Sequence, residues 1–117
     1  MNHLWRGAAL MAVSLLLIAC SARPDASAAP AATDQVDLPR SYKFAPADIT
    51  VALGTTVTWS NNDQFTHSVR LLDDGGEVLV IKPGESVSHT FEQPGLRHYD
   101  CSFHPHDMKG TVLVTGG

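Results

Sequence analysis

The chain has 117 residues, of which 44% are hydrophobic and 17% charged, and its formal net charge is −4. This length and composition suit one small globular domain at most. The sequence contains no run of lysine or arginine, which argues against nucleic acid or an anionic membrane face as its partner.

The first 19 residues have the features of a secretory signal peptide. His3 and Arg6 precede the uncharged, mainly apolar run GAALMAVSLLLIA at residues 7–19. A membrane-spanning helix needs ~20 apolar residues, so this run is too short to cross a bilayer. A buried core helix is the alternative, but the flanking composition argues against it. We therefore expect export out of the cytoplasm.

The signal ends in Leu17-Ile18-Ala19-Cys20, which resembles the lipobox of bacterial lipoproteins. In that pattern the cysteine is diacylated and becomes the mature N-terminus. Each buried methylene adds about 0.8 kcal/mol, so several acyl chains would anchor the protein without a spanning helix. The resemblance implies a periplasm-facing location in the bacterial cell envelope, and Ser21 after the cysteine permits transfer to the outer membrane. An ordinary cleaved signal, with Cys20 as a free thiol, is the alternative.

Residues 20–35 are expected to form a lipidated, disordered tether. The segment SARPDASAAPAATDQ at 21–35 contains almost no large side chain to bury, so it cannot offset the chain entropy lost on folding. As a flexible coil it would reach on the order of 20 Å. The folded domain is therefore expected to cover residues 36–117.

Short runs in which apolar and polar residues alternate fill residues 36–117, and glycine and proline turns separate them. No helical period of useful length occurs there. The segment DITVALGTTVTWSNND at 48–63 alternates on both sides of Gly54, and Pro-Gly pairs at 83–84 and 94–95 divide three further runs. Regular short strands with such turns predict an all-β sandwich or barrel.

The apolar positions of these runs are the expected core. His89 and His98 are interpreted as lying on strand faces opposite Val87 and Tyr99, and so as pointing outward, and residues 73–76 (DDGG) indicate a turn. A domain of about 80 residues buries only ~60–65% of its unfolded surface, so a bound metal would be a reasonable source of additional stability. The expected core includes Ile49, Val51, Leu53, Val57, Trp59, Phe91, Val112 and Val114.

The segment YDCSFHPHDMKG at 99–110 gathers a thiol, two imidazoles and a thioether, from Cys101, His104, His106 and Met108. If Cys20 carries lipid, Cys101 has no disulfide partner. Thiolate, thioether and imidazole together select copper over calcium, magnesium or manganese, and methionine is absent from the usual ligands of structural zinc. A cysteine and two histidines in a plane, with a weak axial methionine, form the blue-copper electron-transfer arrangement.

A tight loop can supply only part of such a site, so another histidine must come from elsewhere. His67 is the expected donor, because the turn-rich stretch SNNDQF places it near one end of the sandwich at the start of a strand. Without the cysteine-containing loop, a lone histidine at this position would more often face solvent.

Two segments together resemble the small cupredoxins, the plastocyanin, pseudoazurin and amicyanin group. They are ADITVALGTTVTWSNNDQFTHSV and PGESVSHTFEQPGLRHYDCSFHPHDMKGTVLV, and the resemblance covers roughly residues 36–115. It implies a cupredoxin-like Greek-key β-sandwich of about seven to eight strands. It also implies one type 1 copper ion, held by His67, Cys101, His104 and Met108.

Two details depart from the family pattern. Three residues separate His104 from Met108, where amicyanin-like loops have two and plastocyanin-like loops four. His106 has the cysteine-to-histidine spacing of azurin-like loops and is a rival ligand; we favour His104 because His-Pro after Cys-x-x is the family pattern. Ser68 stands where the family commonly has asparagine, and its hydroxyl can form a hydrogen bond across to the segment of Ser102, with a shorter reach than asparagine. Hydrogen bonds to the cysteine sulfur would tune the redox potential.

The sequence thus predicts a lipid-anchored blue-copper protein that carries single electrons between redox partners in the cell envelope. The partner proteins are unidentified, and a monomer is expected. Members of the family pass electrons through an apolar surface. Phe103, Pro105 and Pro46 are candidates for forming that surface here. No open position remains for a substrate, so an enzyme is not expected. The alternatives are a periplasmic copper carrier or resistance protein with the same ligands, and a metal-free β module for adhesion or sensing.

Overall fold

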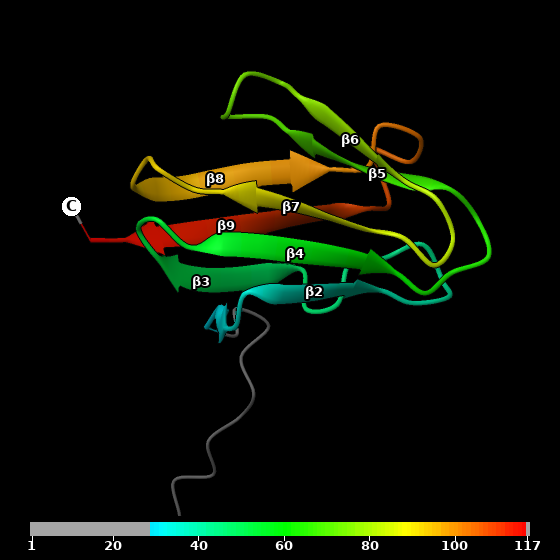
Figure 1. Cartoon of the computed structure of the whole chain (residues 1–117), viewed down its shortest axis with the longest axis horizontal. Helices are drawn as coiled ribbons and strands as arrows, with labels where there is room; N and C mark the ends of the chain where they lie inside the picture. The colour runs from blue at the N-terminus through cyan, green and yellow to red at the C-terminus, as the bar shows by residue number, and fades with distance from the viewer. Residues whose placement is uncertain (1–28, 117) are drawn as a thin grey trace, which may run out of the picture.

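The computed structural model of the chain describes residues 29–116. These residues form nine β-strands in two facing sheets, with no helix among them (Figure 1). The predicted all-β Greek-key sandwich is confirmed, with nine strands in place of seven or eight. Within this described part, no helix is long and apolar enough to cross a bilayer. The predicted signal peptide at 1–19 and the lipidation site Cys20 lie outside the described residues.

The larger sheet has six strands in the order β1-β3-β9-β8-β5-β6. The β3 strand pairs in parallel with β1 and β9, and the remaining pairs of this sheet are antiparallel. Its neighbours β3 and β9 lie far apart in the sequence, so this pair joins the first part of the domain to its last strand. The strands are β1 (Ala31–Ala32), β3 (Asp48–Ala52), β9 (Lys109–Thr115), β8 (Gly95–Asp100), β5 (His67–Leu71) and β6 (Val78–Ile81).

The smaller sheet has the order β2-β4-β7, formed by β2 (Gln35–Leu38), β4 (Thr56–Asn61) and β7 (Ser86–Thr90). Alternate residues of β4, Val57 and Trp59, are fully buried, as the alternation predicts. The intervening hydroxyls of β4 face outward and meet hydroxyls of β7 at 2.7–2.8 Å, in the pairs Thr56–Thr90, Thr58–Ser88 and Ser60–Ser86. Such cross-strand pairs stabilise a sheet.

Part of the segment expected to be a disordered tether forms β-strands. Ala31 and Ala32 form β1 and pair with Ile49 and Thr50 of β3, and β2 begins at Gln35. The reason is that an edge strand needs only backbone donors and acceptors to pair. An argument from side-chain size therefore misses such a strand.

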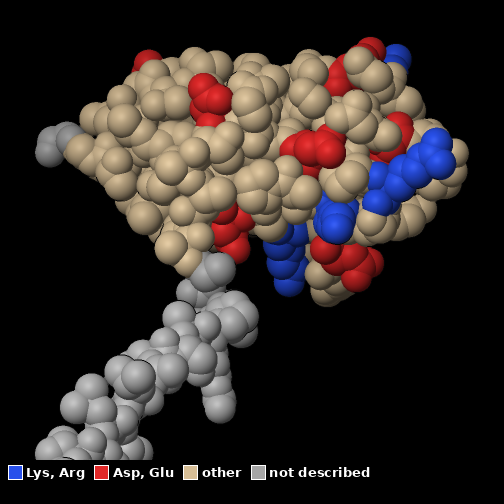
Figure 2. Space-filling view, turned by 90° about the horizontal axis from the view of Figure 1, so that it is seen from below, with Lys and Arg blue, Asp and Glu red and all other residues tan. Residues whose placement is uncertain are grey.

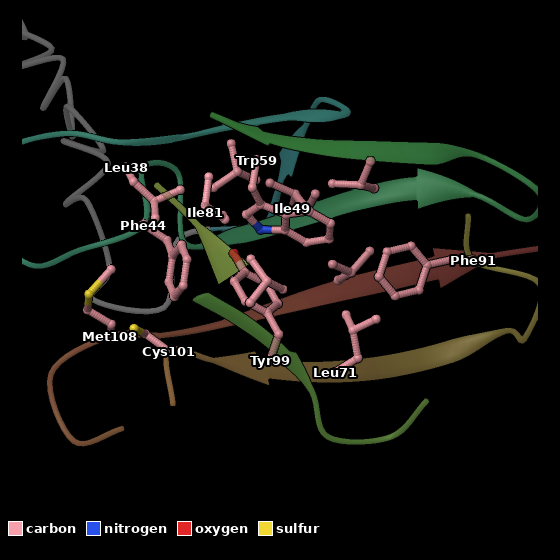
Figure 3. Packing of buried hydrophobic residues seen from close by; sticks show 14 of the residues in the cluster. Leu38, Phe44, Ile49, Trp59, Leu71, Ile81, Phe91, Tyr99, Cys101 and Met108 are labelled. Atoms are coloured by element: carbon pink, nitrogen blue, oxygen red, sulfur yellow. The ribbon is translucent and has the colours of Figure 1, made fainter. Parts of the chain in front are cut away.

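The core lies between the two sheets, and Trp59 and Phe91 are both buried in it, as predicted (Figure 3). The prediction for Leu53 is wrong, because this side chain is 38% exposed. The alternation stops when β3 ends at Ala52, and Leu53 enters a turn with Gly54, whose φ is +86°. The other expected core members are buried: Ile49, Val51, Val57, Val112 and Val114.

The two strand histidines differ. His98 points outward as predicted, and its Nδ1 lies 2.8 Å from Oδ2 of Asp73 in the predicted 73–76 turn. The outward prediction for His89 is wrong: it is half-buried, sits opposite the buried Val57, and meets Phe91 edge-on with ring centroids 4.8 Å apart. Residues two apart in a strand share a face, so His89 follows Val87 inward.

Charged side chains of both signs are interspersed on the face shown in Figure 2, mostly toward one half of the domain. No single-sign patch is visible on that face. This agrees with the absence of a lysine or arginine run in the sequence.

Four strand ends meet at one end of the sandwich, the right-hand end in Figure 1. There β4 ends at Asn61, β5 begins at His67, β8 ends at Asp100 and β9 begins at Lys109. The connections 62–66 and 101–108 therefore lie next to each other, although the sequence separates them widely. The connection 101–108 carries three of the predicted metal ligands, and the fourth, His67, directly follows the connection 62–66.

Candidate metal centre

His67 and Cys101 are brought together by the pairing of β5 with β8. Arg70 pairs with Asp100, so the chain that leaves β8 continues alongside the first residues of β5. The Nδ1 atom of His67 lies 4.0 Å from Sγ of Cys101, and both residues have no solvent exposure. The predicted juxtaposition of a buried imidazole and a buried thiol is therefore present.

The 101–108 loop is closed by its own backbone hydrogen bonds. The Cys101 N–H donates to the Met108 carbonyl at 3.0 Å, and the Met108 N–H donates to the His104 carbonyl at 3.0 Å. The His104 N–H donates in turn to the Cys101 carbonyl at 3.1 Å. These bonds make a compact turn that keeps Cys101, His104 and Met108 near one another.

Met108 is fully buried and lies with Cys101 at one end of the core, close to Phe44 (Figure 3). The His104 ring is half-buried, and its centroid is 5.9 Å from that of His67. The four predicted ligands therefore lie at the same end of the sandwich. Among residues 29–116, no three His, Cys, Asp or Glu side chains are already close enough together to hold a metal ion.

His106 takes a different direction from His104. It is exposed, and it lines a surface groove together with His98 of β8 and Leu72, the residue after β5. Of the two histidines in the loop, His104 is the one beside His67.

Two hydrogen-bond donors of Ser68, its backbone N–H and its hydroxyl, lie near the sulfur of Cys101. The Ser68 N–H points at the sulfur from 3.4 Å and the Ser68 hydroxyl lies 3.8 Å from it. Ser68 Oγ also accepts from the Ser102 N–H at 2.8 Å and lies 2.8 Å from the Ser102 hydroxyl. The hydrogen bond expected between these two serines is present, and it ties the two ligand-bearing segments together.

Two neighbours of the histidines were not anticipated from the sequence. Asp63 Oδ2 lies 2.8 Å from Nε2 of His67, and the Tyr42 ring meets the His104 ring edge-on, with centroids 4.8 Å apart. Tyr42 also stacks on Phe65 at 5.8 Å. Asp63 sits in a segment whose composition indicates only a turn, and nothing in the sequence places Tyr42 near the 101–108 loop.

Asp63 is almost fully buried, and a network of hydrogen bonds fixes it. The Asn61 side-chain oxygen accepts from the Asp63 N–H at 2.9 Å, while the Asn61 amide donates to the carbonyls of Phe65 and Ile81, both at 2.8 Å. The hydrogen bond with His67 lowers the pKa of Asp63 despite the opposing effect of desolvation. Asp63 is therefore present as a carboxylate at neutral pH.

The donor chemistry suits copper. A thiolate, imidazoles and a thioether form a soft-to-intermediate set. The separation of 4.0 Å between Nδ1 and Sγ is shorter than the sum of the metal–nitrogen and metal–sulfur bond lengths of zinc sites, ~2.0 and ~2.3 Å. One ion can therefore bond to both atoms.

The β-sandwich and this donor set define a copper protein of the cupredoxin class. The chain belongs to the family of copper-binding proteins described as plastocyanin/azurin, whose family model matches residues 35–115. It is a small cupredoxin with one type 1 copper ion as its cofactor.

Individual relatives agree with this membership. Amicyanin-alpha from Methylorubrum extorquens is 31% identical over 120 residues, covering 97% of this chain and 99% of the relative. The structure of a purple cupredoxin from Nitrosopumilus maritimus is 31% identical with a TM-score of 0.59, covering 69% of this chain and 98% of that one. A Cu-containing nitrite reductase from Thermus scotoductus is 31% identical with a TM-score of 0.59, over 71% of this chain but only 22% of the reductase.

Proposed function

We propose that His67, Cys101, His104 and Met108 bind the copper ion and that the protein carries single electrons between redox partners. The observation that carries this proposal is the buried contact of His67 Nδ1 with Cys101 Sγ at 4.0 Å. Cys101 would supply a thiolate, the two histidines imidazole nitrogens, and Met108 a weak thioether donor. His104, whose ring centroid is 5.9 Å from that of His67, would supply the second of these nitrogens.

The scaffold explains why these residues suit electron transfer. Copper supplies the one-electron couple, and the two oxidation states prefer different coordination geometries. His67 belongs to a strand, Cys101 and Met108 are fully buried, and backbone hydrogen bonds close the loop between them. Side chains held this way change little in position when the charge on the ion changes, so little reorganisation opposes transfer.

The surface next to the site supports docking of a partner. Phe103 is 53% exposed and Phe65 47% exposed, and Tyr42 links Phe65 to His104. Of the residues expected in an apolar surface, Pro46 is exposed and Pro105 half-buried. We propose that electrons enter and leave through this aromatic surface, over His104.

We do not assign an enzyme activity. Four protein ligands leave no coordination position for a substrate, in contrast to catalytic metal sites, which keep one open. We propose instead that the protein is an electron carrier. It would work with redox proteins of the bacterial cell envelope and be anchored there through lipid on Cys20.

Voltammetry of the copper-loaded full chain tests the carrier role. We expect a reversible one-electron wave and fast electron self-exchange, with the copper retained in both oxidation states. Rapid transfer of Cu(I) to a chelator or an acceptor protein, with no reversible wave, would support copper carriage and would contradict electron transfer.

A further inference from the structure

The side of His67 that faces away from Cys101 is occupied by a carboxylate. Asp63 Oδ2 lies 2.8 Å from Nε2 of His67, and the two side chains are 3% and 0% exposed. A hydrogen bond in such a buried place is screened little by water and contributes more than one at the surface.

This contact determines which nitrogen of His67 carries a proton. A carboxylate only accepts hydrogen bonds, so Nε2 must be the donor. In the neutral imidazole the other nitrogen, Nδ1, then has the free lone pair. Nδ1 is the atom that faces Cys101 Sγ, and a metal ligand needs that lone pair.

Asp63 is itself held in a fixed orientation. Its own N–H donates to Asn61, and its second carboxylate oxygen accepts the Gln64 N–H at 2.7 Å. Oδ2 is thereby left for His67. The sequence of contacts Asn61–Asp63–His67 connects the end of β4 to the proposed copper ion.

We propose that Asp63 is a positioning residue that fixes the tautomer and ring orientation of His67, and that its buried negative charge lowers the reduction potential of the copper. The inference rests on the proposed copper site. Carboxylates behind ligand histidines raise the basicity of the ligand. A fixed negative charge close to the ion stabilises Cu(II) more than Cu(I), because the oxidised ion has the larger positive charge.

The molecule provides a matched control in Asp73 and His98. This pair has the same 2.8 Å separation, but its side chains are 39% and 53% exposed, and it lies on the turn between β5 and β6. Water screens a charge at such a position. The substitution Asp73→Asn therefore removes a histidine-paired carboxylate without removing charge from the buried site.

The test compares the full chain with Asp63→Asn, Asp63→Ala and Asp73→Asn. Nitrogen NMR of the metal-free proteins should show His67 protonated on Nε2 in the parent chain and in Asp63→Asn, whose amide oxygen still accepts, and a mixture of tautomers in Asp63→Ala. The potential of the copper form should rise in both Asp63 variants and stay unchanged in Asp73→Asn. Loss of this outer partner should weaken copper binding by Asp63→Ala by about 10- to 100-fold.

Two results would overturn the inference: an unchanged His67 tautomer in Asp63→Ala, or a potential for Asp63→Asn equal to that of Asp73→Asn. If Asp63→Ala fails to fold, the near-isosteric Asp63→Asn still decides the effect of charge. A parent chain that develops no blue band with copper would contradict the proposed function instead, and the NMR measurement on metal-free protein would still test the positioning of His67.

Discussion

The ring of Tyr99 lies directly over the backbone of Gly110: a Cβ atom added to Gly110 would come within 2.3 Å of both the Tyr99 hydroxyl and the Ala47 carbonyl oxygen. Tyr99 and Gly110 are register partners in β8 and β9. They sit just outside the two ends of the 101–108 loop, so their packing fixes the base of the proposed ligand loop.

Gly110→Ala should therefore destabilise the protein strongly. The close contacts are with the Ala47 backbone and the buried Tyr99 side chain, which cannot move aside easily, and overpacking of this kind costs ~1–3 kcal/mol or more. Urea denaturation measures the loss. The exposed neighbour Lys109→Ala is the control, expected within about 0.5 kcal/mol of the parent chain; equal stability of the two variants would refute the packing argument.

Burial of Tyr99 should make the protein sensitive to alkaline pH. Desolvation raises the pKa of its phenol well above the ordinary value of 10.0. A group with a raised pKa in the folded state stabilises the protein fully at low pH, and this contribution is lost as pH rises above the unfolded value. The unfolding free energy of the parent chain should fall above about pH 10.

Tyr99→Phe is the matching variant, since it keeps the ring and removes only the hydroxyl. The Tyr99 hydroxyl donates to the Ala47 carbonyl at 2.7 Å, but that carbonyl also accepts from the Thr111 N–H. Its removal should cost only about 1 kcal/mol at neutral pH and should flatten the alkaline decline. An equally steep decline in Tyr99→Phe would assign the pH dependence to other groups.

The hydroxyl of Ser68 should tune the copper site. Hydrogen bonds to the cysteine sulfur withdraw charge from the thiolate and so raise the potential. Ser68→Ala removes the hydroxyl that lies 3.8 Å from Cys101 Sγ and should lower the potential. Ser88→Ala on the outer face of the smaller sheet, where the hydroxyl meets Thr58, should leave it unchanged. A higher potential in Ser68→Ala would contradict this account of the sulfur.

Tyr42 should protect the proposed copper ion from solvent. Its ring packs edge-on against His104 and His67, with centroids 4.8 and 5.9 Å away. Tyr42→Ala would open this side, and a chelator should then remove Cu(I) several-fold faster, whereas Tyr42→Phe should behave as the parent chain. Stopped-flow measurement with a chromogenic chelator compares the three proteins, and identical rates would exclude a shielding role.

Local patterns predicted most of the fold. Period-two alternation placed Val57, Trp59, Val112 and Val114 in the core, because strand residues two apart share a face. The same rule was broken at Leu53, where the strand ended one residue earlier than the apolar pattern. At His89 the rule gives the inward face, because Val87 two residues earlier also points inward. The β1 strand pairs through its backbone, so the amino-acid composition of this segment could not predict it.

The site could be predicted only where potential metal ligands lie at a characteristic spacing in the sequence. Cys101, His104 and Met108 lie in one short loop, and the cysteine's need for further donors pointed to His67. The sequence alone left His106 as a rival, and the fold places the His104 ring beside that of His67 while His106 is exposed. The roles of Asp63 and Tyr42 depend on contacts between separate loops, so no local pattern could indicate them.

The optical and EPR spectra of the copper-loaded full chain test the central claim most directly, measured for the parent chain and for Cys101→Ser, His104→Ala and His106→Ala. The account predicts one copper per chain with an intense blue sulfur-to-copper band, which Cys101→Ser abolishes, His104→Ala strongly alters and His106→Ala leaves unchanged. A band that survives in Cys101→Ser, or that depends on His106 and not on His104, would contradict the proposed ligand set.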